Sequence, residues 1–123
     1  MFDGENYISL VTFRKDGSEV PTPVWFAEIG EKLWVFTDGT SYKVKRLRRN
    51  PEIRAAACGV FGEVTGPWFE GNAKIVTDAS AIADANQALL AKYGWQLRSL
   101  NVLSTLGGRI GRRAYLEIEV SET

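Results

Sequence analysis

The chain contains no histidine and a single cysteine, Cys58, among its 123 residues. Without histidine it lacks the commonest general base, the commonest metal ligand and every Ser-His or Cys-His nucleophile. It also cannot form the Cys/His clusters that bind zinc, so we expect no metal site. Cys58 has no disulfide partner and lies in an apolar stretch, where we expect an inert core residue. If the chain is an enzyme, its reactive group arrives with a cofactor.

Net charge and long apolar runs are lacking too. The 15 Lys and Arg residues balance the 15 Asp and Glu residues, which argues against binding nucleic acid through bulk charge. No apolar run approaches the roughly 20 residues that span a bilayer, so we expect no membrane partner. Residues 1–5 lack the basic start and apolar stretch of a secretory signal. With the lone cysteine, this predicts a cytoplasmic protein.

What remains is an ordinary globular composition, with 45% hydrophobic and 24% charged residues. The length and the absence of repeats or linkers predict one domain over residues 1–123. Asp16-Gly17 is a strong hairpin signal, and we expect the first three strands to form an antiparallel meander. Six segments have strand patterns: Tyr7–Phe13, Val20–Glu28, Leu33–Thr37, Ile53–Val60, Phe69–Thr77 and Arg113–Val120.

Three segments are predicted to be helical. The first is a short helix that Ser41 caps and that ends at Asn50-Pro51. The second spans Ala79–Tyr93 with Asp78 as its cap, and the third spans Trp95–Leu106. The glycine-rich segment 107–113 lacks the spacing of a phosphate-binding loop, and we interpret it as a link.

The central strands are apolar on both faces. In Val20–Glu28, Val24 and Phe26 share one face while Pro23 and Trp25 share the other, and Leu33–Thr37 is also apolar on both. A half-solvated strand would carry polar residues at alternate positions. We therefore expect one face to pack on the core and the other on a second subunit, a flat ligand or both.

The segment Ser41–Asn50 concentrates positive charge, with five cations and no acid. Ser41 and the free backbone N–H groups of the helix start favour an anion. Lys43 can reach the same anion, and Thr37 at the end of the preceding strand can add a hydroxyl. Two or three charge-assisted hydrogen bonds of about 1.5–3 kcal/mol each would supply much of the roughly 8 kcal/mol of a micromolar affinity.

Helical spacing divides these cations between two faces. Lys43 and Arg46 or Leu47 share one face, which we expect to serve the ligand, and Lys45 and Arg49 share another, which we expect to face solvent. On composition alone, a merely solvated cationic helix and a nucleic-acid contact remain alternatives.

Several motifs together resemble the pyridoxamine 5′-phosphate oxidase-like split β-barrel superfamily, and within it the small F420-dependent branch. They are the strand Tyr7–Phe13, the T-P-V-W-F run at Thr22–Phe26, the S-x-K-x-x-x-L-R-x-N-P pattern from Ser41 to Pro51, and Gly66-Pro67 followed by Glu70-Gly71. They follow the family's order over roughly the first two-thirds of the chain. The resemblance implies a mainly β, six-stranded antiparallel split β-barrel of the FMN-binding type. It also implies a homodimer with two cofactor sites at the subunit interface.

The resemblance assigns the phosphate end of the site to Thr37, Ser41 and Lys43. Arg46 or Arg49 would contact the negatively charged tail of coenzyme F420.

The ring end is assigned to the stretch Pro23, Val24 and Trp25, whose backbone would run along the ring system. Residues near Trp68 and Phe69 of the second subunit would lie across the ring. Among the tryptophans, Trp25 is the one we expect beside a ring.

The activity that the resemblance implies is reduction of a small electron-poor organic acceptor by hydride from reduced F420. No residue is singled out as catalytic, and the substrate cannot be named. An FMN-dependent oxidase or reductase and a non-catalytic cofactor carrier remain the alternatives.

Overall fold

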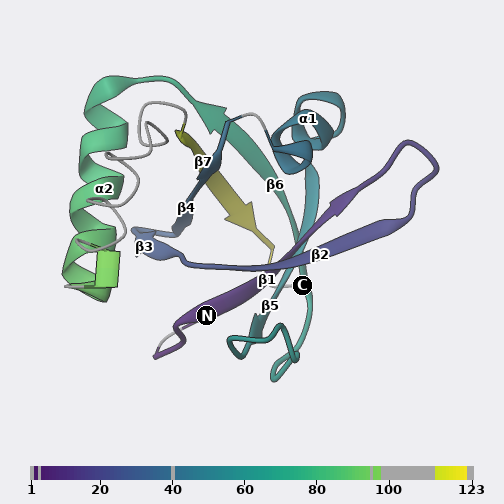
Figure 1. Ribbon diagram of the computed structural model, residues 1–123, viewed down its shortest axis with the longest axis horizontal. Coiled ribbons are helices and arrows are strands. Elements are labelled where there is room, and N and C mark those ends of the chain that lie inside the picture. Colours follow the sequence, from purple (N-terminus) through teal and green to yellow (C-terminus); the bar gives the residue numbers. More distant parts are fainter. Residues whose placement is uncertain (1, 3, 40, 95, 98–112, 122–123) are drawn as a thin grey trace.

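The computed structural model describes residues 2–121 apart from 3, 40, 95 and 98–112, and its main feature is one curled antiparallel sheet (Figure 1). The strands follow one another in the sheet in the order β2-β1-β5-β6-β7-β4-β3. The predicted mainly β, antiparallel fold is thereby confirmed. The strands are β1 (Tyr7–Phe13), β2 (Glu19–Val24), β3 (Ala27–Ile29), β4 (Lys32–Asp38), β5 (Glu52–Cys58), β6 (Phe69–Val76) and β7 (Arg113–Val120).

The described residues form seven strands rather than the predicted six, because the segment Val20–Glu28 is interrupted at Trp25 and Phe26. The two halves, β2 and β3, form the two edges of the sheet. One short stretch of chain therefore passes directly from one edge of the curled sheet to the other. Both hairpins of the predicted meander form, because β1 pairs with β2 and β3 pairs with β4. The break separates the two hairpins, so the predicted continuous meander is wrong, and β4 lies between β3 and β7.

The first hairpin forms where Asp16-Gly17 predicts it. Asp16 Oδ1 accepts hydrogen bonds from the Ser18 backbone N–H at 2.9 Å and from the Ser18 hydroxyl at 2.7 Å. Gly17 has a φ of +86°, a conformation that costs glycine little and other residues much more. This turn places β1 and β2 side by side.

Within the described residues two helices flank the sheet, α1 (Tyr42–Arg49) and α2 (Ala79–Tyr93), and both begin at the predicted caps. Ser41 Oγ accepts the backbone N–H of Val44 at 3.4 Å, and Asp78 Oδ2 accepts that of Ala81 at 2.9 Å. Each cap satisfies a backbone donor that has no partner within the first helical turn. The third predicted helix and the predicted link 107–113 lie almost wholly outside the described residues, and Arg113 at the end of the link begins β7.

The sheet has an apolar interior and an outer face that α2 partly covers (Figure 1). Leu33 and Val35 of β4 belong to the interior core, whereas Trp34 packs outside against Ala85 of α2. The second face of β4 is thus covered by a helix of the same chain, and the expectation of a subunit or ligand there is wrong. Pro23 of β2 is exposed, so at β2 the outer face has no such cover among the described residues.

No helix in the described part of the chain combines the length and apolar content that a bilayer crossing needs. The cytoplasmic location stays a prediction.

Candidate cofactor site

The end of β4 and the start of α1 form a corner that contains the predicted phosphate-binding residues. The Ser41 backbone N–H donates to Asp38 O at 3.0 Å and turns the chain directly from strand into helix. Thr37 and Ser41 are both half-buried at this corner. The Ser41 hydroxyl accepts the helix-capping bond, which leaves its own proton for another acceptor. Thr37, Ser41 and Lys43 therefore lie at one corner of the fold, and the binding of a phosphate there stays a prediction.

Lys43 is the unusual charge at this corner. Its side chain is half-buried, yet no hydrogen bond or ion pair joins it to any other described residue. Burial, and then the nearby charge of Arg46, lowers the pKa of the Lys43 ammonium. An unpaired, partly desolvated cation gains free energy when an anion binds beside it.

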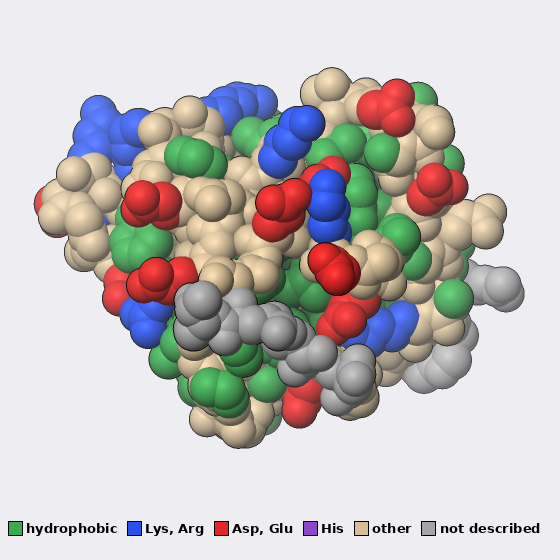
Figure 2. Space-filling model, turned by 180° about the vertical axis from the view of Figure 1, so that it is seen from behind, with side chains coloured by type: hydrophobic (Ala, Val, Ile, Leu, Met, Phe, Trp, Pro, Cys, Tyr) green, Lys and Arg blue, Asp and Glu red, His purple; other side chains and the backbone are tan. Residues whose placement is uncertain are grey.

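A second group of cations adjoins Lys43, and we call Arg14, Arg46 and Arg49 the arginine cluster. Arg46 Nε donates to Thr12 Oγ1 and Arg49 Nη2 to the carbonyl of Phe13, both at 2.8 Å. Burial, followed by the charges of Arg14 and Arg49, lowers the pKa of the Arg46 guanidinium. Arg49 is exposed but bonds back to the end of β1, so it is held near Arg46 rather than on a separate solvent face. Lysine and arginine side chains gather on this side of the molecule (Figure 2, upper left).

Leu47, which was the alternative to Arg46 on the ligand face, packs instead in the interior core. With Val44 it forms the buried side of α1. Lys45 is exposed and lies over the Tyr42 ring at 5.1 Å. The helix thus presents Lys43 and Arg46 beside the sheet and Lys45 to solvent.

The predicted ring-binding stretch Pro23–Trp25 ends β2 and begins the break. Because β2 is an edge strand, one side of its backbone pairs with no other strand. Trp25 packs with Phe36 against the same apolar cluster at the end of α2. Phe36 directly precedes Thr37 in β4, and the side chains of these two residues point to opposite faces of the sheet. Trp25 also stacks on Tyr93, with ring centroids 4.5 Å apart and planes 10° apart.

Trp68 and Phe69 lie away from this region, at the start of β6, three strands from β2 in the sheet order. Trp68 is 36% exposed and stacks on the Arg54 guanidinium at 4.7 Å. Phe69 faces inward, where its ring meets that of Phe2 at 5.7 Å. Phe69 packs against the same interior cluster as Val24, and a contact of either residue with a partner's cofactor stays a prediction.

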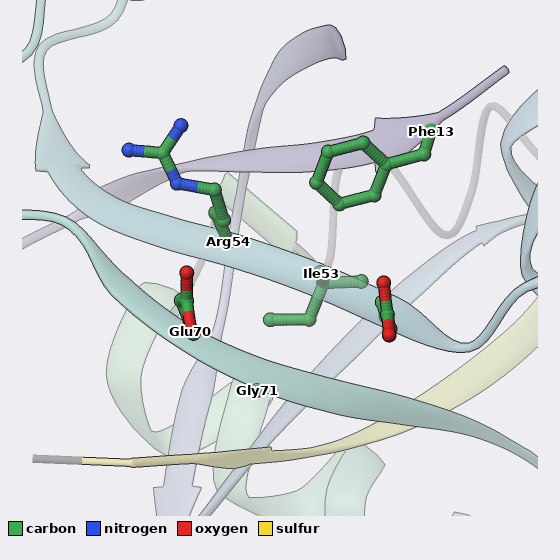
Figure 3. A pocket seen from close by; sticks show the side chains of 6 residues that line it. Phe13, Ile53, Arg54, Glu70 and Gly71 are labelled. Carbon is green, nitrogen blue, oxygen red and sulfur yellow. The ribbon is translucent and has the colours of Figure 1, made fainter. Parts of the chain in front are cut away.

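Two cavities lined by described residues lie elsewhere on the sheet. One of about 230 Å³ lies over β5 and β6, where Arg54 and Glu70 extend beside Ile53 and Phe13 (Figure 3). Glu52 also lines it, and Arg54 is paired with Glu19 at 2.7 Å. The other, of about 360 Å³, is lined by Pro51, Asn72, Ala73, Lys74, Glu117 and Glu119. Neither cavity includes a residue of the phosphate corner.

Cys58 is buried at the end of β5. Burial, with smaller contributions from Glu63 and Glu5, raises the pKa of its thiol. A protonated, buried thiol is a poor nucleophile, so Cys58 fits the predicted core role.

Sequence reasoning missed Arg14, Tyr93 and Arg113. Arg14 precedes the first turn and is far from α1 in the sequence. The fold brings its charge close to Arg46 of α1. Arg113 lies opposite Asp38 in the β4–β7 register and covers the Phe36 ring at 4.4 Å. Tyr93 could have been suspected, since a tyrosine ending the apolar face of a helix needs a partner for its hydroxyl.

Comparison with known proteins gives one family match, to pyridoxamine 5′-phosphate oxidase, over residues 1–123. No functionally curated protein matches the sequence significantly.

Solved structures with a similar fold include the conserved hypothetical protein Rv2991 of Mycobacterium tuberculosis, at 22% identity and a TM-score of 0.73 over 97% of this chain and 75% of that one. The heme storage protein HutZ of Vibrio cholerae has 12% identity and a TM-score of 0.73 over 98% and 84%. A protein named F420 reductase has 17% identity and a TM-score of 0.63 over 98% and 90%. At these identities the likeness shows the fold alone.

Proposed function

The chain belongs to the pyridoxamine 5′-phosphate oxidase family, and on that premise we propose that it binds coenzyme F420 and uses it to reduce a small electron-poor organic acceptor. The phosphate group would lie at the β4–α1 corner and the ring along Pro23–Trp25. The observation that carries the proposal is the unpaired, half-buried Lys43 at the start of α1.

The residues of the corner fit a phosphate. The start of α1 supplies backbone N–H groups and the positive end of the helix dipole. The Ser41 hydroxyl proton and the Lys43 ammonium add two donors, and no acidic residue occurs in the first turn of α1. An anion here would relieve the cost of holding Lys43 and Arg46 close together.

The arginine cluster favours F420 over FMN. FMN carries one phosphate, which the corner alone would satisfy, whereas F420 continues beyond its phosphate into a tail of carboxylates. Arg46 and Arg49 lie beside Lys43 and are held by Thr12 and Phe13. Their remaining guanidinium N–H groups suit carboxylates, which arginine binds in planar, often bidentate pairs.

When bound, reduced F420 supplies the hydride from C5 of its deazaflavin ring. The chain's own part is to hold that ring and the acceptor face to face, which can lower the barrier substantially. Trp25 forms one wall of the ring site, and its own orientation is fixed by stacking on Tyr93. None of the predicted phosphate-binding residues Thr37, Ser41 and Lys43 is an acid, and we propose that any proton comes from water or a hydroxyl.

We further propose that the active form is a homodimer, with the partner subunit's Trp68 beside the ring. Four of the six large apolar side chains exposed among the described residues lie between β5 and β6: Val60, Phe61, Val64 and Trp68. The same turn reaches β2, because Gly62 lies next to the Pro23 ring. An apolar surface of this kind favours association with a second protein surface.

The decisive experiment is a fluorescence titration of the purified protein with F420 and, separately, with FMN. We expect Lys43→Ala to weaken F420 binding by about 1.5 kcal/mol, roughly tenfold, because one charge-assisted contact is lost. Lys45→Ala removes an equal charge from the exposed side of α1 and is the matched control. Equal affinities of wild type and Lys43→Ala would contradict the proposed phosphate site.

The titration also separates the alternatives. A yellow purified protein that prefers FMN would indicate the FMN-dependent enzyme. Tight F420 binding without oxidation of reduced F420 by any of a panel of nitro, quinone and enone acceptors would indicate a carrier.

A further inference from the structure

The break between β2 and β3 leaves backbone N–H and C=O groups without hydrogen-bond partners in a neighbouring strand. The last ladder pair on one side is Val24 with Ile8, and the first on the other is Ala27 with Trp34. Phe26 lies between them without a strand partner, yet its side chain is 1% exposed. Buried backbone N–H and C=O groups almost always find partners.

The hydroxyl of Tyr93, the last residue of α2, replaces the missing strand. It accepts the Phe26 N–H at 2.9 Å, and its own proton faces the carbonyl oxygens of Asn6 at 2.8 Å and Phe26 at 3.0 Å. The Tyr93 ring meanwhile lies flat on Trp25, 4.5 Å away. One side chain therefore fixes both residues of the break.

The hydroxyl can act as a donor throughout the physiological pH range. Tyr93 is 6% exposed, and burial raises the pKa of its hydroxyl to about 12 despite the opposing bond to Phe26. The arrangement is also covered from outside, because Lys92 Nζ lies 3.3 Å from the centroid of the Phe26 ring.

We propose that Tyr93 is a positioning residue for the ring end of the cofactor site. By stacking on Trp25 and bonding the Phe26 backbone, it sets the plane of the indole and the course of the stretch Pro23–Trp25. The inference rests on the proposed F420 site and adds to it a role for α2.

A purely structural tyrosine would lower stability without distinguishing between parts of the ligand, so the test uses two probes. The first probe is the deazaflavin nucleoside analogue that lacks the phosphate and tail, and the second is inorganic phosphate. Tyr93→Phe keeps the stacked ring and loses the hydroxyl. We expect it to weaken nucleoside binding about three- to tenfold and to alter the absorbance spectrum of the bound deazaflavin, while phosphate binding is unchanged.

Lys43→Ala should behave in the opposite way, weakening phosphate binding and leaving the nucleoside unaffected. The matched control is Tyr115→Phe. Tyr115 is also buried and packs near α2, with its ring 6.3 Å from Phe36, but no hydrogen bond joins its hydroxyl to another described residue. It should leave both affinities unchanged.

If Tyr93→Phe does not fold, Trp25→Leu removes the other half of the stack and should show the same loss for the nucleoside alone. A Tyr93→Phe protein, or in its place a Trp25→Leu protein, that binds both probes as wild type does would overturn the role of Tyr93. In that case an intact Lys43→Ala effect would leave the proposed function standing. A wild-type protein that binds neither F420 nor FMN would overturn the proposed function and this role with it.

Discussion

At the scale of single residues, Lys43 and Tyr93 differ in how their polar groups are satisfied. The Lys43 side chain is partly buried and the Tyr93 side chain is buried. Tyr93 donates and accepts within the protein, so its hydroxyl is satisfied without a ligand. Lys43 has no such partner among the described residues. In that part of the chain no side-chain nitrogen or oxygen is both buried and without a partner, so the Lys43 ammonium retains access to solvent. A ligand can therefore reach it.

The raised pKa of Tyr93 predicts a loss of stability in alkali. The hydroxyl titrates near 10 in the unfolded chain and at about 12 in the folded protein, so folding favours the protonated form. Its contribution is complete below pH 10 and is lost as the pH rises towards 12, by about 2 kcal/mol at most. Tyr93→Phe lacks this contribution, so the free-energy gap between wild type and variant should shrink from pH 8 to pH 11.5. Urea unfolding at both values measures it.

Tyr115→Phe serves as the control for this measurement as well. Tyr115→Phe keeps the Tyr93 hydroxyl and should therefore keep the loss of stability in alkali. A constant gap between wild type and Tyr93→Phe would show that the folded and unfolded chains titrate alike at Tyr93.

At the scale of elements, the sequence predicts what local chemistry determines. Asp78 with Ala81, and Ser41 with Val44, are caps whose partners lie three residues away. The bounds of β1, α2 and β7 match the prediction for the same reason. The break at Trp25 was missed because alternation continues through it: Phe26 points into the core, while Trp25 and Ala27 pack towards α2. Alternation of apolar and polar residues shows which face of a sheet each residue occupies. It does not show at which residue the pairing with a neighbouring strand ends.

The candidate site shows the same division. Thr37, Ser41 and Lys43 lie within seven residues of one another, so a strand followed by a capped helix was enough to bring them together. Arg14 and Tyr93 join the region only through contacts between distant segments. The two-sided pattern of β4 likewise indicated that something covers it, but not that the cover is α2.

The cap of α2 gives a prediction at this scale. Asp78→Ala leaves the Ala81 N–H without its acceptor and should lower the free energy of unfolding by about 1 kcal/mol. Asp84→Ala removes an equal charge from an exposed position within α2 and should cost nothing, since alanine is the better helix former. Thermal unfolding by circular dichroism compares the two. Equal stabilities would show that the bond at 2.9 Å contributes nothing net.

At the scale of the whole molecule, the two sides of the sheet differ in what covers them. Trp34 of β4 and Val76 of β6 have α2 across their outer face. On the other side, Pro23, Ser9 and Ala56 lie in one row across the register of β2, β1 and β5, and in this row Pro23 is exposed while Ser9 and Ala56 are buried. A stable dimer needs about 800 Å² from each subunit, about a tenth of the 7250 Å² that the chain exposes. We expect a second copy to bind over the exposed apolar turn between β5 and β6, beside Pro23.

The corresponding prediction concerns Phe61, which is 92% exposed on the turn between β5 and β6. Sedimentation velocity of the wild type should give twice the chain mass of 13.7 kDa. Phe61→Asp places a charge in the proposed interface and should shift the protein towards monomer at micromolar concentration, because a buried unpaired charge is costly. Ile29→Asp, on the edge strand β3, is the control and should remain dimeric.

Since the ring site would be completed by the partner, the monomeric variant should also bind F420 more weakly. A wild-type monomer that binds F420 with full affinity would rule out a shared site.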